Sequence, residues 1–355
     1  MANDKWRMTN GESPMTNDQL DPERERELIE QLEQLPQRID GELSKVIIGQ
    51  KDVVRQLLIS LLSGGHCLIT GAPGLAKTLL VKSIGELFNL RFSRIQFTPD
   101  LMPADITGTD ILEEDQHGRR TMRFIPGPIF ANVLLADEIN RTPPKTQSAL
   151  LEAMQERQVT AAGRRHVLDR PFFVLATQNP IEMEGTYPLP EAQLDRFMFN
   201  VLMDYLSEDD EVAVVQQTTS REAASLSPLF DGSQVSEFNQ VVQRVPVADD
   251  VVRYAVRLAS ASRPGRPGAT EHVNQYVSWG AGLRAAQNLV LGGKAAALVD
   301  GRSHVSADDI RSLCQPVMRH RILPNYRAEA EGISTEMIVA HLVETVGHPR
   351  QEAVA

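Results

Sequence analysis

Short apolar runs that alternate with helical stretches constrain the fold of this chain more than any other feature. Between residues 66 and 177 there are four such runs, with the sequences HCLIT, RFSRIQF, NVLLAD and FFVLAT. Runs of this kind are typical of strands that are buried on both faces of a mainly parallel sheet. The helical stretches between them supply the crossovers that parallel strands need. We therefore expect an α/β domain built on a parallel sheet.

The pattern changes after the run FMFNVLMDY, which ends near residue 204. Beyond it we find only helical patterns with polar starts, so we expect a smaller all-helical domain and no further strands. The predicted organisation is a mobile tail over 1–20, a helical segment over 21–44, the α/β domain over 45–204 and the helical domain over 205–355.

The segment DPERERELIEQLEQL predicts a helix in front of the α/β domain, because Asp21 and Pro22 form a good helix start. Its apolar residues have helical spacing and are Leu28, Ile29, Leu32 and Leu35. We interpret it as a surface helix that covers the edge of the next domain. An arm that binds a partner is the alternative.

Composition and charge narrow the class of protein. The chain has 355 residues, 42% hydrophobic and 23% charged, as in an ordinary globular protein, and its length predicts about two domains. The net charge of -11 argues against a polyanion as the main partner, although a ring can hide a basic channel. We expect no signal peptide and no membrane span. Cys67 and Cys314 fit a reducing compartment, so we expect a cytoplasmic protein.

The stretch LITGAPGLAKT nearly matches the phosphate-binding pattern G-x-x-x-x-G-K-[ST], between an apolar run and a helical stretch. Helix N-terminal amides donate to phosphate, Lys77 neutralises the terminal phosphates and Thr78 offers its hydroxyl to Mg²⁺. The sixth position is Ala76, which is tolerable if it has helical dihedral angles, because only a positive φ demands glycine. The predicted nucleotide-binding residues are Gly71, Ala72, Pro73, Gly74, Leu75, Ala76, Lys77, Thr78 and Leu79.

Two adjacent carboxylates, Asp137 and Glu138, end the apolar run ANVLLAD. The carboxyl ends of strands in a parallel sheet are where ligands bind. We expect Asp137 to hold Mg²⁺ and Glu138 to polarise water for attack on a γ-phosphate. A pair that only caps the following helix is the structural alternative, and the phosphate loop upstream disfavours it.

Three further polar residues follow in an order that fits the same site. The run FFVLAT ends before Gln178 and Asn179, and an amide there could orient the attacking water. Arg196 ends a short helix after Pro190, and arginine suits contact with phosphate oxygens and transition-state charge. Arg284 opens a helix of the second domain and could reach the same nucleotide from above. The structural alternatives are a turn at Asn179, a surface ion pair at Arg196 and, at Arg284, an ordinary arginine at a helix start.

In this order the segments resemble the AAA+ ATPases, and among them the MoxR family. VIIGQKDVVRQLL is similar to the family's box before the phosphate loop, and GAPGLAKT resembles its Walker A loop, in which alanine replaces the last glycine. LLADEINRTPPKTQSALLEAMQERQVT is similar to its Walker B strand and the next helix, and ATQNPIEMEGTYPLPEAQLDRFMF to its sensor-1 and arginine-finger segment. The likeness runs from about Val46 to Val346.

The resemblance implies an AAA+ αβα nucleotide-binding domain with a parallel sheet, followed by an all-α lid. It assigns the adenine pocket to Ile48, Gly49 and Gln50, sensor 1 to Asn179, a finger acting in trans to Arg196 and sensor 2 to Arg284. Around sensor 2 the family usually reads G-A-S-P-R-A, whereas this chain reads GAGLRA. The proline turn is therefore lost, and the lid is expected to couple more loosely to nucleotide.

Two inserts, TGTDILEEDQHGRRTMRFIPGP and RQVTAAGRRHVL, read as β-hairpins on the surface. The resemblance implies that the first interrupts helix 2, that the second precedes sensor 1 and that both line a central pore.

The function expected from these features is a Mg²⁺-dependent ATPase that assembles into a ring, a hexamer by resemblance, with ATP and Mg²⁺ as cofactors. It would remodel a protein client or help to install a metal or cofactor. The resemblance implies a partner that carries a von Willebrand factor A domain, on a separate chain.

Three alternatives stay open. A nucleic-acid motor of the minichromosome-maintenance type shares the alanine-containing loop and the helix-2 insert, and Arg164, Arg165 and His166 on the second hairpin could touch phosphates. The acidic balance makes nucleic acid the less favoured partner. The second is a magnesium-chelatase-like ATPase subunit. The third is a nucleotide-dependent scaffold with little turnover, and the intact Asp137, Glu138, Asn179 and Arg196 argue against this scaffold.

Overall fold

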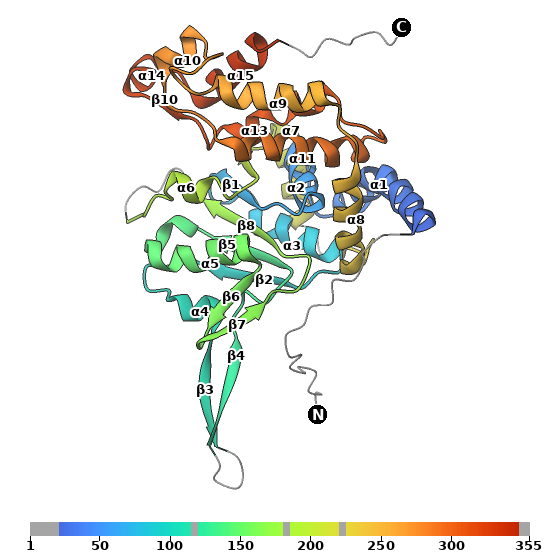
Figure 1. Ribbon diagram of the computed structural model, residues 1–355. Helices are drawn as coiled ribbons and strands as arrows, with labels where there is room; N and C mark the ends of the chain where they lie inside the picture. The colour runs from blue at the N-terminus through green and yellow to red at the C-terminus, as the bar shows by residue number, and fades with distance from the viewer. Residues whose placement is uncertain (1–20, 115–119, 180–184, 220–224, 348–355) are drawn as a thin grey trace.

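A five-stranded parallel sheet forms the centre of the first domain (Figure 1). The computed structural model describes residues 21–114, 120–179, 185–219 and 225–347. The strand order is β2-β5-β8-β1-β9. The strands are β1 (Cys67–Gly71), β2 (Phe92–Gln96), β5 (Val133–Asp137), β8 (Phe173–Gln178) and β9 (Phe199–Met203). They coincide with the five apolar runs, so the prediction of a parallel α/β domain is confirmed.

Alternate residues of the strands face two separate cores, which is why the runs read as apolar throughout. On β1, Cys67 and Ile69 pack toward one side and Leu68 toward the other. The first core also contains residues of α1 (Pro22–Leu43), α2 (Lys51–Leu62) and α3 (Lys77–Leu87). The second contains residues of α4 (Pro103–Thr107) and α5 (Pro144–Glu156). The short helices η1 (Ile139–Arg141) and α6 (Glu191–Leu194) follow β5 and β8.

The second domain is helical and shares the first core. Its helices are α7 (Glu208–Thr219), α8 (Gly232–Arg244), α9 (Asp249–Ala261), α10 (Glu271–Tyr276), α11 (Leu283–Val299), α12 (Ala307–Ser312), α13 (Cys314–Met318), α14 (Tyr326–Glu331) and α15 (Thr335–Thr345). The expectation of no further strands is wrong in one detail. A short antiparallel ribbon pairs β10 (Val277–Trp279) with β11 (Leu323–Pro324). Two residues on β11 carry too little pattern to be read as a strand.

Helix α1 packs on the body through one face and leaves most of its other residues exposed or half-buried, as expected for a surface helix. Its apolar stripe, Leu28, Leu32, Leu35, Ile39 and Leu43, is buried in the first core. In Figure 1 it lies beside α2 and α8, at the junction of the two domains. The tail over 1–20 lies outside the described residues. The boundaries at 44/45 and 204/205 stay predictions.

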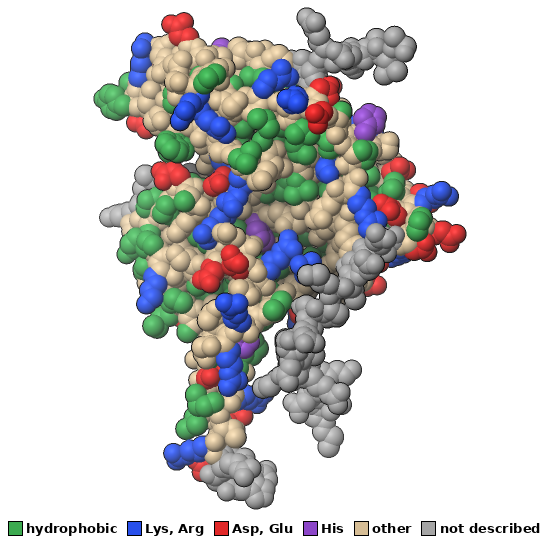
Figure 2. All heavy atoms as spheres, viewed as in Figure 1, with side chains coloured by type: hydrophobic (Ala, Val, Ile, Leu, Met, Phe, Trp, Pro, Cys, Tyr) green, Lys and Arg blue, Asp and Glu red, His purple; other side chains and the backbone are tan. Residues whose placement is uncertain are grey.

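Both inserts are β-hairpins, as expected. β3 (Gly108–Glu114) pairs with β4 (Arg120–Pro126) and projects from the body, while β6 (Gln158–Ala161) pairs with β7 (Arg164–Val167) at its base (Figure 1). The projecting hairpin carries basic, acidic and apolar side chains together (Figure 2). His166 stacks on Phe124 with ring centroids 4.1 Å apart, so it joins the hairpins rather than facing outward. The prediction that it could touch phosphates is therefore wrong, whereas Arg164 and Arg165 are exposed.

Candidate functional site

The predicted phosphate loop, carboxylates and amide meet at one edge of the sheet. They follow β1, β5 and β8, and β8 lies between the other two strands. Because the strands are parallel, their carboxyl ends share an edge, where ligands bind in open α/β sheets. Asn179 follows β8 directly and is 8% exposed. The strand order, which the sequence left open, therefore places Asn179 between the phosphate loop and Asp137.

The glycines of the loop serve different purposes. A Cβ on Gly71 would lie 2.4 Å from the carbonyl oxygen of Met203, so glycine is required there by the close approach of β9. Gly74 has φ +83° and open space around it, so its requirement is conformational. Ala76 has φ +55°. The condition under which alanine was expected to be tolerated, ordinary helical dihedral angles, is therefore not met, because Ala76 occupies the left-handed region that glycine tolerates better.

Positive φ values recur at this site in residues other than glycine. Gln50, Ala76 and Glu138 have φ values of 60°, 55° and 58°. Such conformations cost free energy and persist where the surrounding structure holds them, often at functional sites. At these three positions the backbone turns sharply as it enters a helix that borders the site.

Lys77 begins α3, and its Nζ donates a hydrogen bond to the carbonyl oxygen of Gly71. Burial lowers the pKa of Lys77, and the nearby charges of Asp137 and Glu138 oppose that shift. The ammonium group therefore lies within electrostatic reach of both carboxylates. Thr78 follows it in the first turn of α3, half-buried.

A hydrogen-bond network fixes both carboxylates. Thr177 Oγ1 donates to Asp137 Oδ1 at 2.6 Å and accepts from the Glu138 amide at 2.8 Å. Gln96 Nε2 donates to Glu138 Oε2 at 3.0 Å, and Arg94 forms an ion pair with Asp137 Oδ2 at 2.6 Å. Sequence reasoning missed Gln96 and Arg94. They reach the site because β2 pairs with β5 in a register that sets Gln96 opposite Asp137.

The donor set suits a hard cation. Mg²⁺ prefers oxygen ligands and is usually held by one or two carboxylates with substrate phosphates and waters. The Thr78 hydroxyl and the Asp137 carboxylate supply such oxygens near Lys77. Within the described ranges no group of three or more His, Cys, Asp or Glu side chains could hold a metal, so a metal cage made by protein alone is not present there. Cys67 and Cys314 are free and buried.

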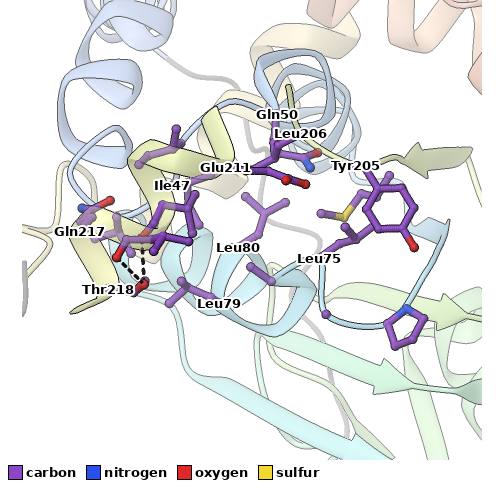
Figure 3. A pocket seen from close by; sticks show the side chains of 18 of the residues that line it. Ile47, Gln50, Leu75, Leu79, Leu80, Tyr205, Leu206, Glu211, Gln217 and Thr218 are labelled. Carbon is purple, nitrogen blue, oxygen red and sulfur yellow. Dashed lines mark hydrogen bonds between the residues drawn. The ribbon is translucent and has the colours of Figure 1, made fainter. Parts of the chain in front are cut away.

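A cavity of about 720 Å³ adjoins the phosphate loop. Its size suits a small-molecule ligand, since such pockets usually measure about 300–1,000 Å³. Its walls come from the segment before α2, the phosphate loop with α3, and the segment from Tyr205 into α7 (Figure 3). The lining residues include Ile47, Ile48, Gln50, Pro73, Gly74, Leu75, Ala76, Leu79, Leu80, Tyr205, Leu206, Glu211, Val214, Val215, Gln217 and Thr218.

The predicted adenine residues lie at or beside this cavity. Ile48 and Gln50 line it, and Gln50 Nε2 donates to the carbonyl oxygen of Asp204 at 3.3 Å. Gly49 packs beneath Leu206, whose Cδ2 would lie 2.9 Å from an added Cβ. The contribution of Tyr205 and α7 was missed, because their contact with the loop depends on how the second domain folds back.

The two predicted arginines lie elsewhere. Arg196 lies three residues before β9, whose first residue, Phe199, pairs with Cys67 at the start of β1. It is therefore at the amino edge of the sheet, about 15 Å from the phosphate loop for a strand of this length. Arg284 Nη1 lies 3.3 Å from Asp195 Oδ2 and lines the same cavity of about 180 Å³ as Arg196. The structure does not bring Arg284 to this chain's own phosphate loop.

Comparison with known proteins agrees with this geometry. Residues 66–199 match the ATPase family associated with various cellular activities (AAA), and residues 269–342 match the AAA lid domain. The chain is 41% identical over 313 residues to the chaperone MoxR1 of Mycobacterium tuberculosis, covering 88% of this chain and 82% of the relative. It is 31% identical over 319 residues to the protein MoxR of Paracoccus denitrificans, covering 85% and 93%.

A solved structure is equally similar. A crystal structure from Cytophaga hutchinsonii, provisionally described as an ATPase, superposes with a TM-score of 0.84 at 41% identity, covering 92% of this chain and 98% of that one. The fold and the site thus define an AAA-type ATPase domain with its lid. The chain belongs to the MoxR family of AAA+ ATPases. Among the described residues no helix is long and apolar enough to cross a membrane.

Proposed function

We propose that this chain is a Mg²⁺-dependent ATPase that works as a ring, probing a protein client with its hairpins and completing each active site with residues of a neighbouring copy. The observation that carries the proposal is the position of Arg196. The phosphate loop follows β1 and Arg196 precedes β9, at opposite edges of two paired parallel strands. Arg196 is therefore remote from its own nucleotide and is available to the next subunit's nucleotide.

Each residue of the site has a role in this proposal. Lys77 neutralises the terminal phosphates of ATP, while Thr78 and Asp137 would hold Mg²⁺, which would supply further neutralisation of phosphate charge. Glu138 polarises the attacking water and Asn179 orients it. The base lies in the 720 Å³ cavity, against Ile48 and Gln50.

Arg284 belongs with Arg196 in this scheme. Both line one small cavity, and Asp195 lies within hydrogen-bond reach of Arg284. We therefore assign Arg284 to the neighbour's nucleotide rather than to its own. A cation that is supplied by a neighbour stabilises transition-state charge and makes hydrolysis depend on assembly.

The wider function rests on the family. We propose that the ring, a hexamer, remodels a protein client or assists the insertion of a metal or cofactor in the cytoplasm. We further propose a separate partner chain with a von Willebrand factor A domain. The hairpins β3–β4 and β6–β7 are the segments proposed to face the client in a central pore.

Two substitutions test the site. Lys77→Ala is expected to abolish binding of a fluorescent ATP analogue, and Glu138→Gln to keep binding while hydrolysis falls by about a hundredfold or more. Lys82→Ala is the matched control, because Lys82 lies on the same helix and pairs with Glu86 on the surface. Hydrolysis near the wild-type rate in both site variants would contradict the assigned roles.

The assembly is tested with the Glu138→Gln variant in ATP. Sedimentation is expected to show a ring, and affinity capture under the same conditions to retain the partner chain. A monomer that hydrolyses ATP at the full rate at any concentration would overturn the proposed ring.

A further inference from the structure

Three consecutive residues of the lid domain form hydrogen bonds with the segment that carries Arg196. Arg319 Nη1 donates to the carbonyl oxygen of Asn200 at 3.2 Å. His320 Nε2 lies 3.2 Å from the carbonyl oxygen of Phe197, and Arg321 Nη2 donates to the same oxygen at 2.6 Å. The segment 319–321 follows α13, more than a hundred residues along the chain from Arg196.

Arg321 is the centre of this contact. Its side chain is 2% exposed, and burial lowers its pKa to about 10, so it stays a cation at neutral pH. Nε donates to Asp195 Oδ1 at 2.7 Å, and Nη2 donates to the Asp195 carbonyl oxygen at 3.0 Å. Nη1 donates to the carbonyl oxygens of Met198, at 3.3 Å, and Val317. Every nitrogen of the planar guanidinium therefore has a partner, which a lysine ammonium could not reproduce.

Asp195 joins two lid arginines through different oxygens. Oδ1 accepts from Arg321 and Oδ2 from Arg284. The next residue is Arg196, whose side chain makes no hydrogen bond or ion pair within the part of the chain that the structure describes. The backbone on both sides of Arg196 is thus fixed by the lid, while its guanidinium is left for another partner.

A role in joining the two domains alone explains this contact less well. Joining two domains requires only apolar burial, and a buried ion pair adds little net stability because desolvation opposes the attraction. A guanidinium that binds one carboxylate and several successive carbonyl oxygens instead specifies the path of residues 195–198. That path sets where the Arg196 side chain begins.

We propose that Arg321, with Asp195, is a positioning residue for Arg196 and transmits the position of a subunit's own lid to the active site of its neighbour. This inference rests on the proposed function, in which Arg196 acts in trans. Arg319 contacts β9 at Asn200, and β9 ends at Met203, which lines the base cavity, so a lid that responds to bound nucleotide would move the Asp195–Arg321 contact and the finger with it.

Subunit mixing tests the inference with Arg321→Lys, which keeps the charge and loses the planar fork. Alone, this variant is expected to hydrolyse ATP about ten- to a hundredfold more slowly, as for a displaced catalytic group, and to bind a fluorescent ATP analogue as the wild type does. When Arg321→Lys is mixed with Glu138→Gln, which has an intact finger and an inactive site, the ATP hydrolysis of the mixture is expected to recover. In a ring of randomly mixed subunits, about a quarter of the subunit interfaces would combine an intact nucleotide site from one subunit with an intact finger from its neighbour.

Controls separate the two proposals. Arg196→Ala mixed with Glu138→Gln must also recover, and failure of that mixture overturns the trans-acting finger and this inference with it. If that mixture recovers and Arg321→Lys does not, Arg321 acts on its own site and the inference alone is overturned. Arg327→Lys, an exposed lid arginine paired with Glu331, is expected to behave as the wild type. If thermal unfolding shows that Arg321→Lys is not folded, Asp195→Asn replaces it, with the same outcomes expected.

Discussion

Arg94 and Asp137 form an ion pair across two neighbouring strands, with Arg94 Nη2 and Nε lying 2.6 Å and 3.1 Å from Asp137 Oδ2. Asp137 is the carboxylate that we assign to Mg²⁺, so a side-chain cation is already paired with the group that would hold the metal. Arg94 Nη2 also donates to Gln96 Oε1 at 2.8 Å, and Gln96 in turn binds Glu138. Arg94 and Gln96 on β2 therefore connect the Asp137 carboxylate to the Glu138 carboxylate through a continuous chain of hydrogen bonds.

Replacing Arg94 should strengthen metal binding. Mn²⁺ serves as a paramagnetic substitute for Mg²⁺. Arg94→Gln is expected to lower the dissociation constant of Mn²⁺ by about threefold in the presence of ADP, because a competing cation is removed. The effect is modest because the Arg94 side chain is 46% exposed and screened by solvent. Electron paramagnetic resonance measures the free Mn²⁺. Arg91→Gln is the control, since Arg91 pairs with Asp169 instead. Equal metal affinity in Arg94→Gln and wild type would show that the ion pair does not compete.

Removing the Thr177 hydroxyl should disturb both carboxylates at once. Thr177→Val keeps the shape of this buried side chain but leaves the Glu138 amide and Asp137 Oδ1 without that partner. We expect the free energy of unfolding to fall by about 1–3 kcal/mol and hydrolysis by about tenfold, from the lost hydrogen bonds and displaced Glu138. Urea unfolding and a phosphate-release assay measure the two effects. Thr177→Ser, which keeps the hydroxyl, should hydrolyse close to the wild-type rate; a valine variant as active as the serine variant would refute the role.

The positive φ of Ala76 predicts opposite effects of two substitutions. Ala76→Gly relieves the conformation but also loosens the unfolded chain, so the free energy of unfolding should stay equal or rise by up to about 1 kcal/mol. Ala76→Val should lower it by more than about 1 kcal/mol, because a β-branched residue is a genuine outlier at this φ. Urea unfolding without nucleotide compares the three proteins. Equal stability of the valine variant would mean that the loop adopts another backbone conformation.

Stability should decline in mild acid because of His66. The Val174 amide donates to His66 Nδ1 at 3.1 Å, so the ring must be neutral and donate through Nε2 to the carbonyl oxygen of Met154. Burial lowers the pKa of His66 to about 4 from an ordinary value of 6.5. A group whose pKa is depressed on folding contributes its full stability above the unfolded pKa and loses it as the pH falls toward the folded pKa. Between pH 6.5 and 4 the loss is about 3 kcal/mol from this residue.

His66→Gln isolates that contribution. A glutamine amide can offer one donor and one acceptor and does not titrate, so the variant should lose less stability over the same pH range. Urea unfolding at pH 7, 5.5 and 4.5 measures the difference. Burial also lowers the pKa of His320, which adds to the acid sensitivity of both proteins equally. An identical pH dependence of wild type and variant would exclude His66 as the source.

Local sequence determined the elements and most of the chemistry of this protein. Buried parallel strands, a glycine loop before a helix and a carboxylate pair after an apolar run are each specified within about ten residues, so Lys77, Thr78, Asp137 and Glu138 could be located from sequence. The inserted hairpins followed for the same reason, because a turn flanked by strand-like runs is a local signal.

Only the tertiary structure decided which side chains meet. The pairing of β2 with β5 brings Gln96 and Arg94 to the carboxylates, and the lid's return to the sheet brings Arg321 to Asp195. The parallel pairing of β1 with β9 sets Arg196 at the edge opposite the phosphate loop. Strand order, register and domain packing depend on contacts between residues far apart in the chain, and a single sequence carries no local signal for them. The left-handed conformation of Ala76 also depends on tertiary structure, because the surrounding fold holds a backbone angle that alanine by itself would avoid.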